Sequence, residues 1–119
     1  MKKDKIIIGS YVNINGDRTI IDDQLLEKIT NEEITQIEPI RLDDGWLNDF
    51  GFRKCYDCWR YEHSESKSVE IRFTKDRQVL IRFDLDGADN FFNEETQHVH
   101  MLQYLCFLKF QKMFSLDDN

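Results

Sequence analysis

The chain has 119 residues, of which 40% are hydrophobic, and this predicts one domain over residues 1–119 with a real apolar core. Its 23 acidic and 16 basic side chains give a formal charge of −7. That charge argues against a general nucleic-acid-binding surface and against attraction to anionic membranes. No apolar run reaches the length of a membrane span, and three cysteines without a secretion signal favour reduced thiols in the cytoplasm.

Four elements are predicted before Pro39, the only proline, which marks an extended connection. Asn-Gly between two apolar segments is a strong signal for a two-residue hairpin turn, and aspartate is a favoured helix cap. The predicted helix would turn Leu25, Leu26 and Ile29 inward. In chain order the elements are a strand over 5–13, a returning strand over 18–21 that follows the Asn15-Gly16 turn, a helix over 24–29 capped by Asp22 or Asp23, and a strand over 33–37.

Residues 43–52 predict a compact helical unit. Asp43 is a natural N-cap, and Gly51 fits the left-handed residue that often ends a helix. Phe52 would then fold back to cover the helix. The apolar face of this helix consists of Trp46, Leu47 and Phe50.

Three strands are predicted next, over residues 54–63, 69–73 and 79–83, with a polar turn over 64–68. Trp59 and Tyr61 share one face of the first strand. If residues 75–77 form the second loop, the pattern sets the register of the last two strands. The facing pairs are then Phe73 with Val79, Ile71 with Ile81, Val69 with Phe83 and, on the other face, Glu70 with Arg82.

The C-terminal residues 94–114 predict a helix with more apolar surface than one side of a sheet requires. One stripe, flanked by Leu105, would face the core: Val99, Leu102, Cys106, Phe110 and Met113. A second face carries Met101, Tyr104, Phe107 and Leu108, and either this chain or a partner covers it. The predicted fold class is α+β, an antiparallel β-sheet with a long C-terminal helix packed on it and one or two short helices.

Three motifs suggest metal or redox chemistry, and for each a structural role is favoured. Cys55 and Cys58 have CxxC spacing, but residues three apart in a strand face opposite sides, and structural zinc needs four ligands. His98 and His100 would lie about 200° apart on a helix, so capping or hydrogen bonding is favoured over chelation. Residues 84–90 fail the calcium-loop pattern and predict an Asp-Gly turn. We therefore predict no catalytic residues, no metal site and no cofactor.

Three segments resemble one family. Residues 8–12 resemble its opening strand, and residues 37–52 its central signature of Glu-Pro-Ile-x-Leu, Trp-Leu and Phe-Gly-Phe. Residues 99–107 resemble its Val-His-x-Leu-Gln-x-Leu-x-Phe signature. The family comprises small proteins of Bacteroidetes genomes, prophages and phages, and offers no catalytic residues to carry over. Family members end in a Thr-Gly-Glu-Glu-Leu type of segment, from which residues 109–114 depart.

The resemblance implies a phage or mobile-element protein in the cytoplasm of a bacterial host. Small acidic proteins of that setting often inhibit host defence, so by analogy we expect an anti-CRISPR-like, non-enzymatic inhibitor. Its expected partner is a host nucleic-acid-guided immune effector, such as a CRISPR effector with its guide RNA. The predicted partner-binding residues are Met101, Tyr104, Phe107, Leu108, Asp43, Asp44 and Asp49.

Two other classes stay open at this point. One is a small single-stranded nucleic-acid-binding or accessory phage protein, with bases stacked on Trp59 and Tyr61. The other is a metal-dependent enzyme that uses Cys55, Cys58 and the histidines. The net charge disfavours direct nucleic-acid binding and membrane binding, and a homodimer is also open.

Overall fold

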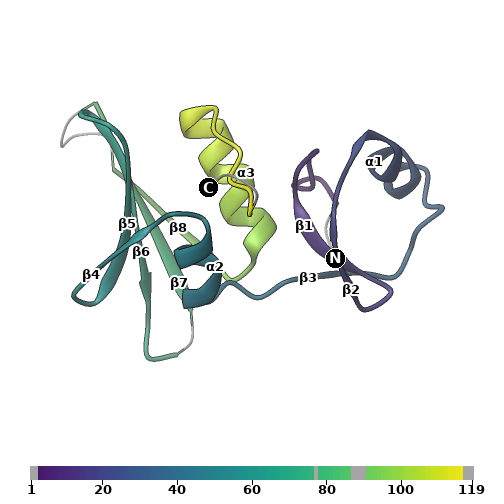
Figure 1. Ribbon diagram of the computed structural model, residues 1–119, viewed down its shortest axis with the longest axis horizontal. Coiled ribbons are helices and arrows are strands. Elements are labelled where there is room, and N and C mark those ends of the chain that lie inside the picture. The colour runs from purple at the N-terminus through teal and green to yellow at the C-terminus, as the bar shows by residue number, and fades with distance from the viewer. Residues whose placement is uncertain (1–2, 77, 87–90, 117–119) are drawn as a thin grey trace. The chain divides into compact units, whose positions relative to one another are not determined.

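The structure of the protein is a computed structural model that describes residues 3–76, 78–86 and 91–116, with the backbone alone for residues 91–95. The fold is α+β, as predicted, and the described residues form two antiparallel sheets and three helices (Figure 1). The chain divides into two compact units. Unit 1 comprises Met1–Arg41 and His98–Ser115, and unit 2 comprises Leu42–Gln97 and Leu116–Asn119. The single domain over residues 1–119 stays a prediction.

Unit 1 contains a three-stranded sheet of order β2-β1-β3. The Asn15-Gly16 turn is confirmed, since both residues have the positive φ (53° and 85°) that a tight hairpin favours. β3 begins later than predicted because Glu33 still donates its backbone N–H to Lys28 at the end of the preceding helix. The strands are β1 (Tyr11–Ile14), β2 (Asp17–Ile20) and β3 (Ile37–Pro39).

The predicted short helix of unit 1 is confirmed as α1 (Asp23–Thr30). Asp22 is its N-cap, and a carboxylate oxygen of Asp22 accepts a 2.8 Å hydrogen bond from the backbone of Leu25. The inward side of α1 joins an apolar cluster, which consists of Ile6, Val12, Ile21, Ile29 and Ile37 with Ile14, Leu25, Leu26 and Ile34 packed against it.

The C-terminal helix, α3 (Val99–Phe110), contacts β1 of unit 1 and is shorter at both ends than predicted. At its C-terminus Gln111 adopts a left-handed φ of 56° and donates its N–H to Phe107, which ends the helix. Met113 therefore lies beyond the helix, and its side chain lies against Gly9. The rest of the predicted core stripe is buried: Val99, Leu102, Cys106 and Phe110, with Leu105 beside it.

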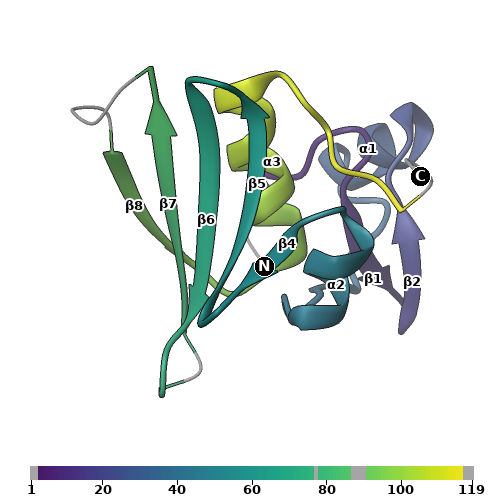
Figure 2. The same ribbon diagram turned by 60° about the vertical axis from the view of Figure 1, so that its left-hand side comes forward.

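Unit 2 contains a five-stranded antiparallel sheet of order β4-β5-β6-β7-β8, whose strands Figure 2 shows side by side. All four predicted β6–β7 pairs are confirmed, including Glu70 opposite Arg82. Residues 94–96 were predicted as the start of the C-terminal helix, whereas their backbone belongs to the last strand and pairs with β7. The strands are β4 (Arg53–Cys55), β5 (Cys58–Ser64), β6 (Lys67–Phe73), β7 (Val79–Leu85) and β8 (Phe91–Thr96).

The helical unit of unit 2 is confirmed as α2 (Asp44–Asp49). Asp43 caps it by accepting a 3.1 Å hydrogen bond from the backbone of Trp46. Beyond the helix, Gly51 has a φ of 92° and donates to Asn48, while Phe52 donates to Leu47. These two bonds form a Schellman motif, which explains why the glycine and the buried phenylalanine follow each other. Of the Asp-Gly turn predicted within residues 84–90, residues 87–90 lie outside the described residues.

Candidate functional site

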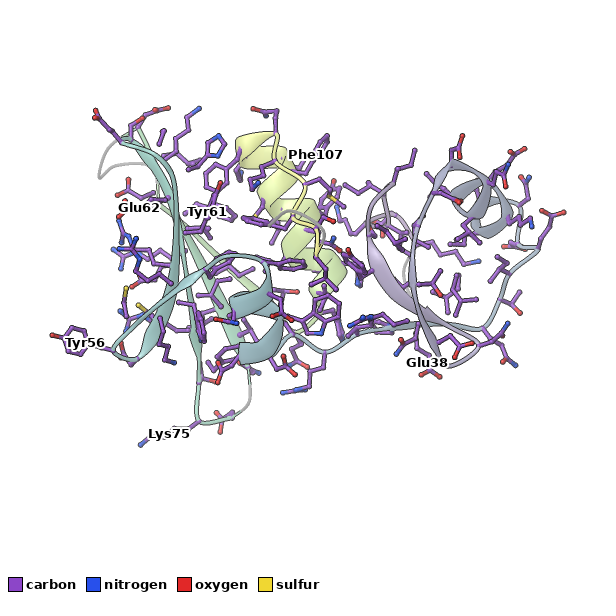
Figure 3. The ribbon with its side chains drawn as sticks, viewed as in Figure 1. Glu38, Tyr56, Tyr61, Glu62, Lys75 and Phe107 are labelled. Carbon is purple, nitrogen blue, oxygen red and sulfur yellow. The ribbon has the colours of Figure 1, made fainter. Side chains whose placement is uncertain are left out.

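Four predicted binding residues lie along one side of α3, because residues three and four apart share a helix face. Phe107 and Leu108 are adjacent and exposed, at 43% and 50% of their surface. Figure 3 labels Phe107 on this helix. Met101 and Tyr104 continue the stripe toward the start of the helix and are half-buried. We call these four residues the α3 stripe. Exposed apolar side chains at contiguous positions are a feature of protein-binding surfaces.

One basic side chain, that of Lys5, lies against the α3 stripe. The ammonium nitrogen of Lys5 lies 4.6 Å from the centre of the Tyr104 ring, a cation–π contact that partly covers the ring. Lys109 follows directly after Leu108 in the same helix. The stripe is therefore an apolar surface with a cation over one of its rings.

The excess of acidic over basic residues lies in unit 2. Unit 1 contains eight acidic and eight basic residues, whereas unit 2 contains fifteen acidic and eight basic residues. The whole net charge of −7 thus resides in unit 2. The apolar and acidic features of the predicted binding surface consequently belong to different units, and each can be altered without touching the other.

The three predicted acidic contacts lie at α2 in unit 2, and all are exposed. Two of them have structural bonds. Asp43 caps α2, and Asp44 accepts a 2.8 Å hydrogen bond from the indole nitrogen of Trp59. Asp49 is the last residue of α2. Substitutions of the first two will therefore change stability as well as surface charge.

Cys55 and Cys58 lie opposite each other, which corrects the prediction that they face opposite sides of one strand. The strand predicted over residues 54–63 is interrupted, because Tyr56 and Asp57 form a tight turn between β4 and β5. Tyr56 has a φ of 53°, is fully exposed and projects from the tip of this turn (Figure 3). The two cysteines are direct cross-strand partners, and such partners point to the same face of a sheet.

The two thiols differ in exposure, and neither is in a disulfide. Cys55 is half-buried and lines an open cavity of about 310 Å³. Cys58 is buried and donates a hydrogen bond to Glu70; burial first, then this bond and the charge of Glu70, raise the pKa of Cys58 to about 11. The cavity beside Cys55 is lined by Gly51, Arg53, Cys55, Arg60, Tyr61 and Glu62.

Charged side chains surround the thiols on this face of the sheet. Burial opposes the ionisation of Glu70, but the bonds from Cys58 and Arg72 and the nearby arginine charges outweigh it and lower the pKa of Glu70. Arg72 bonds Glu70 and Asp57, each at 3.2 Å. Glu70 and its bond to Arg72 raise the pKa of the guanidinium further. The continuous strand predicted over residues 54–63 contained no turn, so this cluster could not be anticipated from it. Asp57 was the sequence signal for the turn, because aspartate is depleted in strands.

The two histidines stack at the start of α3, with ring centres 6.0 Å apart. His98 occupies the N-cap position, but its side chain does not cap the helix. Burial and then the charge of Arg41 lower the pKa of His98. Burial and then His98 lower the pKa of His100 to about 4, and its Nδ1 is a buried atom without a hydrogen-bond partner among the described residues.

The remaining candidates are a metal site and a base-stacking surface. In residues 3–76, 78–86 and 91–116, no group of three or more His, Cys, Asp or Glu side chains could hold a metal ion. Trp59 is buried, with 8% of its surface exposed, so its indole presents no free face to a base. Tyr61 is half-buried, with its ring centre 5.7 Å from that of Phe52. Within the described part of the chain, no helix is long and apolar enough to cross a membrane.

Comparisons of the chain with protein-family models, with curated proteins and with solved structures found no match. The resemblance drawn from the three sequence signatures therefore stays a prediction.

Proposed function

We propose that the protein is a non-enzymatic protein-binding module whose partner docks on the α3 stripe. The observation that carries the proposal is the adjacent pair Phe107 and Leu108, both about half exposed on an otherwise largely buried helix. Burial of two such side chains contributes roughly 2–4 kcal/mol to association, enough to form the centre of an interface. The half-buried Met101 and Tyr104 extend the surface, and both residue types are enriched at interfaces.

The proposed partner is a host nucleic-acid-guided immune effector, such as a CRISPR effector with its guide RNA. This narrower part rests on the phage resemblance and on the acidity of unit 2. An acidic surface is attracted to the basic channels in which such effectors hold nucleic acid. The chain would then act as an inhibitor by occupying or locking the effector, with the apolar stripe providing affinity and the acidic residues steering the encounter.

A binding measurement with paired variants tests this proposal. The probe is a purified CRISPR effector loaded with its guide RNA, and the protein variant is Phe107→Ala with Leu108→Ala. Both side chains are exposed, so the variant should keep its fold. We expect its affinity to fall at least about tenfold, the effect of losing a central apolar pair. The matched control is Ile20→Ala, an exposed apolar residue of β2 in the same unit.

The acidic residues are tested separately by Asp49→Asn, which removes one charge from α2. We expect a slower association rate and a weaker salt dependence, with little change in dissociation. Unchanged binding by the Phe107/Leu108 variant would refute the α3 stripe. Absence of binding to guide-loaded effectors would refute the narrower proposal. A change from dimer to monomer in sedimentation, caused by the same variant, would instead identify a second copy of the chain as the partner.

A further inference from the structure

Cys55 and Cys58 carry an inference that is independent of the α3 stripe. We propose that they form a thiol–disulfide exchange site, in which Cys55 reacts with a low-molecular-weight disulfide and Cys58 then displaces the adduct to close a Cys55–Cys58 bond. The occupant of the neighbouring cavity would be a small disulfide of the glutathione class.

The hairpin geometry suits the final bond. Direct partners in an antiparallel pair have Cα atoms about 4.5–5.5 Å apart, and disulfides bridge Cα separations of about 4.4–6.8 Å. Because Cys55 and Cys58 are such partners, the bond can close without a rearrangement of β4 and β5. In an unbroken strand, as the sequence first indicated, the same two residues could not be joined.

The difference in exposure between the two thiols determines which one reacts first with the reagent. Cys55 is half-buried and lines the open cavity of about 310 Å³, so a small disulfide can reach its sulfur. That volume falls at the lower end of ordinary small-molecule sites. Cys58 is 6% exposed and its thiol is bound to Glu70, so it cannot meet an external reagent equally well. It lies beside Cys55, however, where a sulfur attached to Cys55 comes within its reach.

The proposed oxidation consists of two thiol–disulfide exchange steps. The Cys55 thiolate attacks one sulfur of the reagent, the sulfur–sulfur bond of the reagent breaks, and the first small thiolate leaves and takes a proton from water. Cys58 then loses its proton to solvent and attacks the Cys55 sulfur, which expels the second small thiolate. Two protein thiols are oxidised to one disulfide, and one reagent disulfide is reduced to two thiols.

Cys58 makes the second exchange slow at neutral pH. Its pKa of about 11 leaves little thiolate at neutral pH. The rate at which the Cys55–Cys58 bond closes should therefore rise about tenfold for each unit by which the pH increases toward 11. Glu70 contributes to the raised pKa through its bond and its charge. Removing the charge with Glu70→Gln should therefore speed the second exchange and leave the first unchanged.

The experiment treats the reduced, full-length protein with glutathione disulfide and follows intact mass and peptide maps over time. We expect one glutathione on Cys55 near neutral pH, and its conversion to the Cys55–Cys58 disulfide as the pH rises. Cys58→Ser should retain the adduct at every pH, and Cys55→Ser should lower the modification rate at least about tenfold. Cys106, which is fully buried, is the internal control and should stay unmodified while the protein is folded.

Three results would overturn the proposal. These are modification of Cys55→Ser at the wild-type rate, loss of the adduct from Cys58→Ser as fast as from wild type, and an adduct on wild type that persists at high pH. Circular dichroism shows whether each variant is folded, and Cys55→Ala and Cys58→Ala repeat the measurement if a serine variant is not.

Discussion

Gln103 lies on the buried side of α3 and uses its whole side-chain amide to bind backbone groups of unit 1. Its oxygen accepts from the N–H of Tyr11, and its nitrogen donates to the carbonyls of Gly9 and Phe114, each at 2.9 Å. The side chain is fully buried. One residue thus connects α3 to the start of β1 and to the segment after the helix.

We expect Gln103→Leu to lower the free energy of unfolding by about 3 kcal/mol or more, because three buried backbone groups lose their partners. Urea unfolding followed by circular dichroism measures the change. Gln36→Leu, at an exposed position of the same unit, is the control and should change stability by less than about 0.5 kcal/mol. Equal stability of Gln103→Leu and wild type would show that the amide bonds are replaceable.

His100 should make the protein sensitive to mild acid. Its pKa is about 4 in the folded chain and 6.5 in the unfolded chain, so below pH 6.5 the unfolded state binds more protons. Stability is therefore lost as the pH falls from 6.5 toward 4. Between pH about 7 and about 4.5 the loss due to this residue is about 2 kcal/mol.

The variant His100→Gln should lose about 2 kcal/mol less stability over that pH interval than wild type, as measured by urea unfolding at both pH values. His63→Gln, which makes the same substitution at an exposed histidine, is the matched control. An identical pH dependence for His100→Gln and wild type would mean that the buried ring already accommodates the proton.

At the scale of elements, the carboxylates of α2 differ in whether they bond the backbone of the helix. Asp43→Ala removes the N-cap of α2 and should lower stability by about 1 kcal/mol. Asp49→Ala should change stability by less than about 0.5 kcal/mol, because the residue is an exposed surface position. Thermal unfolding of the two variants measures the difference. If the two variants have the same unfolding temperature, the bond from Asp43 to Trp46 contributes nothing.

Elements with complete local signals could be predicted from the sequence. Capping aspartates, the Asn15-Gly16 turn and the Gly51-Phe52 ending identified α1, the first hairpin and α2 because these signals act within a few residues. The β6–β7 register also followed, since alternation and opposite charges favour the same pairing.

Elements that depend on distant partners could not be predicted in the same way. Residues 94–96, predicted as the start of the C-terminal helix, include the helix formers Glu94 and Glu95, but pairing with β7 makes them part of a strand. In the candidate sites, helical spacing found the α3 stripe, yet the opposed thiols depend on where β4 turns into β5. Nothing in Cys-Tyr-Asp-Cys fixes a turn strongly, because it contains neither glycine nor proline.

At the scale of the whole molecule, most of unit 2 is inserted in the sequence between the two segments of unit 1, so the stabilities of the two units are linked. The two segments of unit 1 are separated by about 56 residues of unit 2, from Leu42 to Gln97. Within unit 1, Arg41 pairs with His98 and the Val99 N–H donates to Ile40. Within unit 2, the Leu42 N–H donates to Gln97 and keeps the ends of the insertion together. If unit 2 unfolds, unit 1 must close a loop of that length, at a cost of about 4 kcal/mol.

A substitution confined to unit 2 should therefore weaken unit 1. Ile71 is fully buried in β6, and Ile71→Ala should destabilise unit 2 by about 2–5 kcal/mol. We expect the protected amides of β1 and α3 to exchange with deuterium faster in this variant, together with those of β6 and β7. Leu80→Ala, at an exposed position of β7, should leave both sets unchanged. Faster exchange in β6 and β7 alone would show that the units unfold independently, and the predicted single domain would then be wrong.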